Sequence, residues 1–202
     1  MTGAIRSRRV VRCAACGLPA AACLCPTVTP VSIETRIALL AHHTEWPKSS
    51  NTGRLLLRLL PGTVVHLRGD PAAERAEAPA LSGRRLVLFP SEGARELTPA
   101  DRGADLVLVV PEGSWAQARR AVKREPWALG AEHVRLPSGP PSRYRLRQAV
   151  HEEGLSTFEA VARALAILEG GAIAEAMLTV FDRFVSRSLA VRGRRSHWDT
   201  AE

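Results

Sequence analysis

Residues 106–124 have the sequence LVLVVPEGSWAQARRAVKR, in which an apolar run, a turn and a basic segment follow one another. The run Leu106 to Val110 has the length and composition of a buried strand. Residues from Ser114 to Arg124 show helical spacing, with Trp115 on an apolar side and basic side chains over the rest. The segment therefore predicts a buried strand that passes through a short turn into a helix.

Strands and helices alternate along the rest of the chain. Short apolar runs predict further strands at Thr35 to Ala41, Thr63 to Leu67, Arg85 to Phe89 and His133 to Leu136. Helices are expected from about Asn51 to Leu60, from Thr157 to Leu168 behind a capping box of Ser156 and Glu159, and from Ile173 to Leu189. This order predicts an α/β fold with a mainly parallel sheet, whose ligand sites lie beyond the carboxyl ends of the strands.

The charge balance favours a polyanionic partner. The chain has 202 residues, with 28 Lys and Arg against 20 Asp and Glu, and almost all of the positive charge is arginine. Guanidinium groups bind phosphates in a bidentate manner, although arginine enrichment can also reflect a compositional bias. No run approaches the roughly 18 apolar residues of a membrane span, and the start lacks the apolar core of a secretory signal. We expect a cytoplasmic protein of one compact domain, without a membrane association.

All four cysteines lie close together near the N-terminus. Their spacing is C-x2-C-x6-C-x-C, and they are Cys13, Cys16, Cys23 and Cys25. Four thiolates satisfy a tetrahedral zinc ion and leave no open coordination position, so a structural zinc is the preferred interpretation. Two disulfides or four free thiols are the alternatives, and a reducing compartment argues against disulfides. Residues 1–30 are expected to form a zinc knuckle and linker, followed by the main domain over 31–191 and a solvated tail over 192–202.

The turn at Pro111 to Trp115 carries the clearest chemical signal. Glu112 stands at the end of the strand, where partial burial can raise the pKa of a carboxyl group enough for general-base work. An ordinary acidic residue in the first turn of a helix is the alternative interpretation. Gly113 and Ser114 lie near a helix N-terminus, where backbone amides suit an anionic ligand. Neither a G-x-G-x-x-G nor a Walker motif is present, so the sequence indicates no nicotinamide or nucleoside triphosphate.

Four features occur together and in one order: the cysteine cluster, SSNTGRLL at 49–56, PEGSW followed by QARR at 111–120, and SRYRLR at 142–147 leading to STFEA at 156–160. This combination resembles the DTW-domain family of tRNA-uridine aminocarboxypropyltransferases. The resemblance implies a SPOUT-like, knotted domain over 31–191 that binds S-adenosylmethionine. The family's Asp-x-Thr-Trp motif is Glu112, Gly113, Ser114 and Trp115 here, so both substitutions keep the functional group.

The resemblance also implies roles for individual residues. Glu112 takes the place of the motif Asp as the base that removes the imide proton of uridine. Trp115 either contacts the cofactor or packs beneath the loop. Expected cofactor-binding residues are Ser50, Asn51, Thr52, Pro111, Gly113, Ser114, Trp115, Leu136, Ser138, Gly139, Ser142, Arg143 and Tyr144, with Arg143 reaching the cofactor carboxylate or an RNA phosphate. Expected RNA-binding residues are Arg119, Arg120, Lys123, Arg124, Arg145 and Arg147.

The implied function is transfer of the aminocarboxypropyl group of S-adenosylmethionine to N3 of a uridine in tRNA, with release of methylthioadenosine. We expect a monomer with tRNA as partner and without an obligate protein partner. Two alternatives remain open at this point. One is an RNA methyltransferase of the same broad fold and cofactor, and the other is a noncatalytic RNA-binding protein with a zinc knuckle.

Overall fold

The computed structural model describes residues 10–71, 79–146 and 154–193. Within these residues it contains a six-stranded sheet in the order β2-β1-β5-β3-β6-β4, and every pairing is parallel. The strands are β1 (Arg36–His42), β2 (Val64–Arg68), β3 (Arg84–Leu88), β4 (Arg95–Glu96), β5 (Leu106–Glu112) and β6 (Glu132–Arg135). The α-helices are α1 (Gly53–Leu59), α2 (Trp115–Arg124), α3 (Thr157–Leu168) and α4 (Gly171–Val191). The predicted α/β class with a mainly parallel sheet is confirmed, and the predicted knot stays a prediction.

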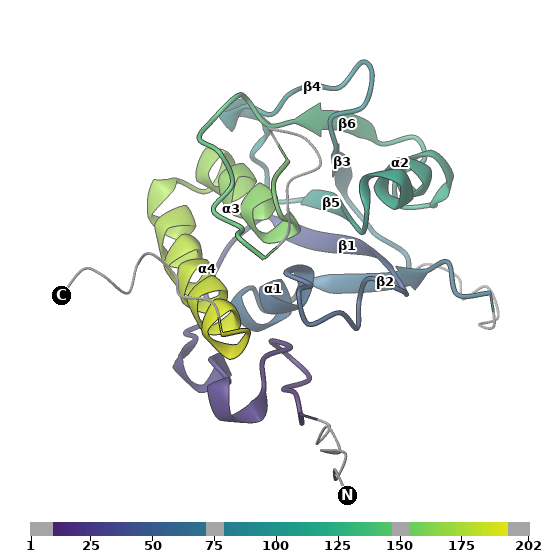
Figure 1. Cartoon of the computed structure of the whole chain (residues 1–202). Coiled ribbons are helices and arrows are strands. Elements are labelled where there is room, and N and C mark those ends of the chain that lie inside the picture. The colour runs from purple at the N-terminus through teal and green to yellow at the C-terminus, as the bar shows by residue number, and fades with distance from the viewer. Residues whose placement is uncertain (1–9, 72–78, 147–153, 194–202) are drawn as a thin grey trace, which may run out of the picture.

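Strand β5 lies at the centre of the sheet and is buried along its whole length. Leu106, Leu108 and Val110 on one face join a core with α1, α3 and α4. Val107 and Val109 on the other face pack against α2. Successive side chains of a strand point to opposite faces, so the continuous apolar run covers both layers of the molecule. Figure 1 shows α2 on one side of the sheet and α1, α3 and α4 on the other.

The cysteine-bearing segment packs beneath α1 and α4 (Figure 1). It contains two short 3-10 helices, Ala20–Ala22 and Cys25–Thr27. Leu18 and Leu24 are almost completely buried in the same core as α4. Arg187 of α4 donates to the carbonyl oxygen of Cys23 at 2.7 Å. The segment from residue 10 to residue 30 therefore shares the core of the sheet, and its division from the main domain at residue 30 stays a prediction.

The predicted strands and α-helices are all present, with ends that shift by one or two residues. Strand β4 is present as well, although sequence analysis did not predict it. Strand β4 has only two residues, and both are charged. Arg95 of this strand contacts the carboxylates of Asp101 and Glu132, each at 2.6 Å. Asp101 is buried, and its hydrogen bonds with Arg95 hold the pKa of its carboxyl group well below the usual range. Ion pairing rather than an apolar pattern thus defines this edge of the sheet.

Among the described residues, the longest helix, α4, combines polar and apolar positions, and no helix has the length and apolar character needed to cross a membrane.

Candidate active site

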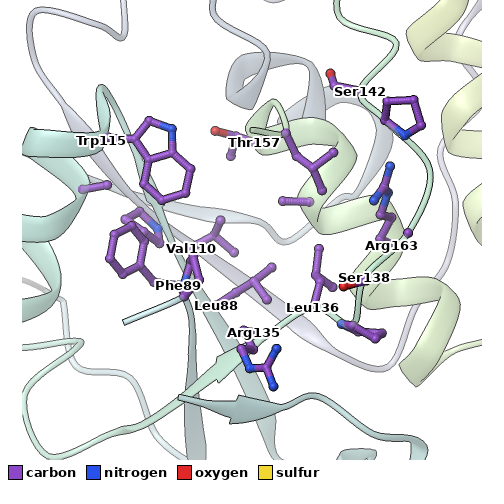
Figure 2. A pocket seen from close by; sticks show the side chains of 18 of the residues that line it. Leu88, Phe89, Val110, Trp115, Arg135, Leu136, Ser138, Ser142, Thr157 and Arg163 are labelled. Carbon is purple, nitrogen blue, oxygen red and sulfur yellow. The ribbon is translucent and has the colours of Figure 1, made fainter. Parts of the chain in front are cut away.

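A pocket of about 820 Å³ opens at the carboxyl ends of β3, β5 and β6 (Figure 2). Leu88, Phe89 and Val110 form its floor, where the strands end. Helix α2 contributes Trp115, Ala118 and Arg119, helix α3 contributes Thr157, Ala160 and Arg163, and the segment from Arg135 to Ser142 closes a further side. This volume is typical of a small-molecule site, and the position is the one that a parallel sheet favours.

The predicted motif at 111–115 connects β5 to α2 on one wall of this pocket. Pro111, Gly113 and Trp115 are lining residues. Ser114 caps α2, because its hydroxyl accepts from Gln117 N while its own amide donates to Gln117 Oε1 at 2.7 Å. The Trp115 ring packs against Phe89 with ring centroids 5.6 Å apart. Trp115 therefore forms part of the pocket wall, whereas Ser114, a predicted cofactor ligand, is engaged in the helix cap.

Glu112 is buried, with 4% of its surface exposed, and it is not itself a lining residue. Asn51 Nδ2 donates to Glu112 Oε1 at 2.9 Å and to the carbonyl oxygen of Glu45 at 3.2 Å. A methyl group on Gly53 would lie 3.0 Å from Glu112 Oε2, so α1 approaches the carboxylate closely at this glycine. The structure thus reveals Asn51 as the residue that orients Glu112, a contact over 61 positions that the sequence did not indicate.

The other predicted residues of the segment after β1 also lie behind the pocket wall. Thr52 Oγ1 accepts from the backbone amide of Phe158 at 3.3 Å, at the start of α3. The carbonyl oxygen of Ser50 accepts from the Tyr144 hydroxyl. Ser50, Asn51 and Thr52 therefore join the loop after β1 to Glu112, α3 and the loop around Tyr144, but the pocket lining does not include them.

The predicted cofactor loop divides into two parts. Leu136, Ser138, Gly139 and Ser142 line the pocket, as expected for residues that contact a ligand there. Arg143 instead pairs with Asp182 of α4 at 2.9 Å, and the Tyr144 ring packs near Phe181 with centroids 6.0 Å apart. Arg143 was expected to reach the cofactor carboxylate or an RNA phosphate; in the structure its guanidinium pairs with Asp182, and a contact with either ligand stays a prediction. The irregular loop gains this geometry from helices that follow it in the chain.

Glu159 holds this loop in place. Only 2% of the surface of Glu159 is exposed. Its carboxylate accepts from Ser142 Oγ at 2.7 Å and from the Arg143 amide at 2.6 Å. It also accepts from the amide and hydroxyl of Ser156, at 3.0 and 2.8 Å, which completes the predicted capping box. Sequence analysis identified the cap and missed the contact with the loop. A single buried carboxylate therefore fixes both the start of α3 and the pocket wall.

The four cysteine sulfurs lie within 4.8 Å of one another. The Sγ atoms are 3.7 Å apart for Cys13 and Cys25 and 3.8 Å apart for Cys16 and Cys23. Disulfide sulfurs are about 2.0 Å apart, whereas sulfurs at the corners of a tetrahedral zinc site are separated by about 3.8 Å. The backbone amide of Cys16 lowers the pKa of the Cys13 thiol to about 6, whereas burial raises the pKa of the Cys23 and Cys25 thiols. The geometry fits a tetrahedral metal site and not a pair of disulfides.

The predicted RNA-binding side chains of α2 form an exposed basic face. Arg119, Arg120, Lys123 and Arg124 are all exposed, and Arg119 also lines the pocket. Arg145 is exposed on the loop beyond Tyr144. Arg147 lies outside the described residues. The basic face of α2 is thus continuous with one wall of the pocket.

The fold is that of a parallel α/β protein with a pocket at the carboxyl edge of its sheet. The sequence matches the model of the DTW domain over residues 10–189, and the chain belongs to this family. It is 30% identical over 167 residues to tRNA-uridine aminocarboxypropyltransferase 2 of Drosophila melanogaster, which covers 78% of this chain and 66% of that protein. It is 27% identical over 173 residues to the Macaca fascicularis protein of the same name, which covers 81% and 58%, respectively. The chain therefore spans about three fifths to two thirds of the length of these relatives.

A solved structure shares the fold. The SAM-dependent rRNA:acp-transferase Tsr3 from Vulcanisaeta distributa matches with a TM-score of 0.55 and 20% sequence identity, and the match covers 80% of each chain. This likeness supports the fold that the family resemblance implied.

Replacement of Glu159 by Ala should loosen the loop, because the amides and hydroxyls that it satisfies would lose a buried acceptor. We expect the free energy of unfolding to fall by about 2–4 kcal/mol in urea denaturation. Trypsin cleavage after Arg143 and Arg145 should become faster. Glu175→Ala on the exposed side of α4 is the matched control and should change stability by less than about 0.5 kcal/mol. Unchanged cleavage in the Glu159 variant would show that other contacts hold the loop.

Proposed function

We propose that the protein transfers the aminocarboxypropyl group of S-adenosylmethionine to N3 of a uridine in tRNA. The main support is a cofactor-sized pocket that is lined by Pro111, Gly113 and Trp115 of the family motif and that continues through Arg119 into the basic face of α2. The names of the curated relatives support the same reaction and the same class of RNA. A methyltransferase would use the same cofactor, so the identity of the transferred group is decided by the experiment below.

The pocket residues suit S-adenosylmethionine in their chemistry. The apolar floor of Leu88, Phe89 and Val110, with Trp115 beside it, offers contact area for an adenine ring. Ser138 and Ser142 supply hydroxyls on the opposite wall. When bound, the cofactor supplies a γ-carbon that its sulfonium activates. We assign these residues to binding the cofactor and to excluding water from it.

Glu112 is the proposed general base. Uridine N3 is a weak nucleophile until its imide proton leaves, and a carboxylate at the end of β5 accepts this proton. The bond from N3 to the γ-carbon forms while the bond from carbon to sulfur breaks, and the electron pair stays on sulfur in methylthioadenosine. Asn51 Nδ2 donates to Glu112 Oε1, and we assign the proton of uridine N3 to this carboxylate.

We further propose that the four cysteines hold a structural zinc ion and that α2 binds the tRNA backbone. Zinc fits the sulfur distances, and four protein ligands leave no position for catalysis. The ion would connect the two ends of the segment from Cys13 to Cys25. Arg187 of α4 binds the same segment through the carbonyl oxygens of Ala22 and Cys23. Support for the second part is that the cations of α2 are exposed and that one of them, Arg119, also lines the pocket.

The transfer is tested by mass spectrometry of nucleosides from unmodified tRNA after incubation with the protein and S-adenosylmethionine. We expect aminocarboxypropyluridine together with an equal amount of methylthioadenosine. Glu112→Gln should lower the transfer rate by about 10²–10⁴-fold, because it removes a general base. The Gln oxygen can still accept from Asn51, so cofactor binding and thermal stability should be retained.

The by-product separates the alternatives in the same measurement. Methylated nucleoside with S-adenosylhomocysteine would move the assignment to a methyltransferase. Tight tRNA binding without any product would favour a noncatalytic RNA-binding protein. A Glu112→Gln variant that keeps the full rate would remove this residue from the mechanism while leaving the reaction intact.

RNA binding by α2 is tested through salt dependence. Each phosphate contact contributes a slope of about −0.7 to −0.9 in a plot of log affinity against log salt. A variant with Arg120, Lys123 and Arg124 replaced by Gln should reduce the magnitude of this slope by roughly 2 in filter binding. Arg102→Gln is the control, since Arg102 is exposed and pairs with Glu34 away from the pocket. Equal slopes for both variants would place the RNA elsewhere.

Metal binding is tested by elemental analysis of the purified protein, which should contain close to one zinc ion per chain. Cys25→Ser should abolish the zinc content and lower the melting temperature by roughly 5–15 °C, because the segment shares the main core. Wild-type protein that is metal-free and equally stable with and without added zinc would contradict the proposal.

A further inference from the structure

We propose that Arg163 binds the carboxylate of the amino-acid chain of S-adenosylmethionine and so sets the direction in which the cofactor lies in the pocket. The inference rests on the proposed function, because it takes the cofactor as given and assigns its carboxylate to a residue. Neither the motifs nor the sequence spacing pointed to Arg163, which lies in the middle of α3.

The pocket has a cationic wall. Arg119, Arg135 and Arg163 line it, and the lining residues that the structure describes include no Asp or Glu. Such a wall attracts an anionic group, and S-adenosylmethionine carries one carboxylate at the end of its amino-acid chain. The three guanidinium groups are therefore the candidates for binding that carboxylate.

Only one of the three cations combines partial burial with the lack of an acidic partner. Arg135 is exposed and pairs with Glu96 at 3.1 Å. Arg119 is exposed on α2, in the face assigned to RNA. Arg163 is partly buried, and no carboxylate oxygen of the described residues lies within 4.0 Å of its guanidinium nitrogens. Burial lowers the pKa of Arg163 from its ordinary value, yet a guanidinium stays protonated at neutral pH.

The contacts of Arg163 orient it for a ligand. Its Nη2 donates to the carbonyl oxygen of Pro140, so the loop fixes the guanidinium through this hydrogen bond. The loop also passes close to Nη1 at Gly139, where an added methyl group would lie 3.1 Å from it. Glu159 attracts Arg163 from one helical turn away. The Glu159 carboxylate is already occupied by donors from Ser142, Arg143 and Ser156. Figure 2 shows Arg163 on the side of the pocket opposite Trp115.

The energetic argument favours an anionic ligand at this point. A partly buried cation loses some of its hydration free energy. Charge-assisted hydrogen bonds to a bound carboxylate offset this cost. With the carboxylate at Arg163, the adenosine lies toward the apolar wall formed by Phe89 and Trp115. Methylthioadenosine has no carboxylate, so the same residue that holds the cofactor gives the by-product no ionic contact. The arrangement therefore favours binding of the intact cofactor over its by-product.

The test compares two ligands by isothermal titration calorimetry: S-adenosylmethionine, which carries the carboxylate, and methylthioadenosine, which lacks it. Arg163→Gln should weaken the affinity for S-adenosylmethionine by about 10–100-fold and change the affinity for methylthioadenosine by no more than about twofold. Arg163→Lys should restore part of the lost affinity for S-adenosylmethionine, because lysine returns the positive charge but not the two parallel hydrogen bonds of a guanidinium. Arg102→Gln is the control, because it removes an exposed arginine that pairs with Glu34 outside the pocket lining, and it should change neither affinity by more than about twofold.

The outcomes separate this inference from the proposed function. Equal weakening of both ligands by Arg163→Gln would overturn the assignment, because Arg163 would then act through the shape of the pocket. Unchanged cofactor binding with weaker tRNA binding would overturn it in favour of an RNA phosphate contact. Wild-type protein that binds neither ligand would overturn both the inference and the proposed function. Binding that follows the expected pattern in a protein without transfer activity would support Arg163 and reject only the reaction.

Discussion

The burial of β5 between two parallel neighbours is the constraint on which the rest of the structure depends. Because β1, β3 and β5 run in the same direction, their carboxyl ends meet at one edge of the sheet. The turn at 111–115 leaves β5 at this edge and leads at once into α2. The pocket, the motif and the basic helix are therefore parts of one arrangement, and a polar residue inside β5 would disturb all of them.

A buried charge stabilises the other half of the site. Residues 136–146, which follow β6, are rich in Pro and Gly and form no helix or strand, so their own sequence does not define a wall. The Glu159 carboxylate supplies the missing order by accepting from the backbone and side chains of that segment. Burial of an anion is costly unless donors surround it, and here the donors come from the loop itself. This coupling makes the geometry of the pocket depend on α3.

The knuckle contributes to the same construction from a distance. Its apolar residues enter the core beside α4, and Arg183 and Arg187 of α4 donate to Thr27 and to the carbonyl oxygens of the knuckle. Arg54, at the start of α1, donates to the carbonyl oxygen of Cys13 at 3.2 Å. The segment thus supports α1, which lies beside Glu112, and α4, which pairs with Arg143 through Asp182. The cysteine cluster is connected to the site in this way, although it lies outside the pocket.

The sequence by itself determined the parallel α/β class, the capping box of α3, the cysteine cluster and the part of the pocket wall formed by Pro111, Gly113 and Trp115. These features depend on residues that are close in the chain, through strand burial, capping boxes and ligand spacing. Only the tertiary structure decided that Asn51 holds Glu112, that Glu159 holds the loop, that Arg143 turns toward Asp182 and that Arg163 faces the pocket. The physical reason is that these contacts join residues from different elements. A side chain shows its residue type in the sequence, but its partner is chosen only when the sheet brings distant segments together.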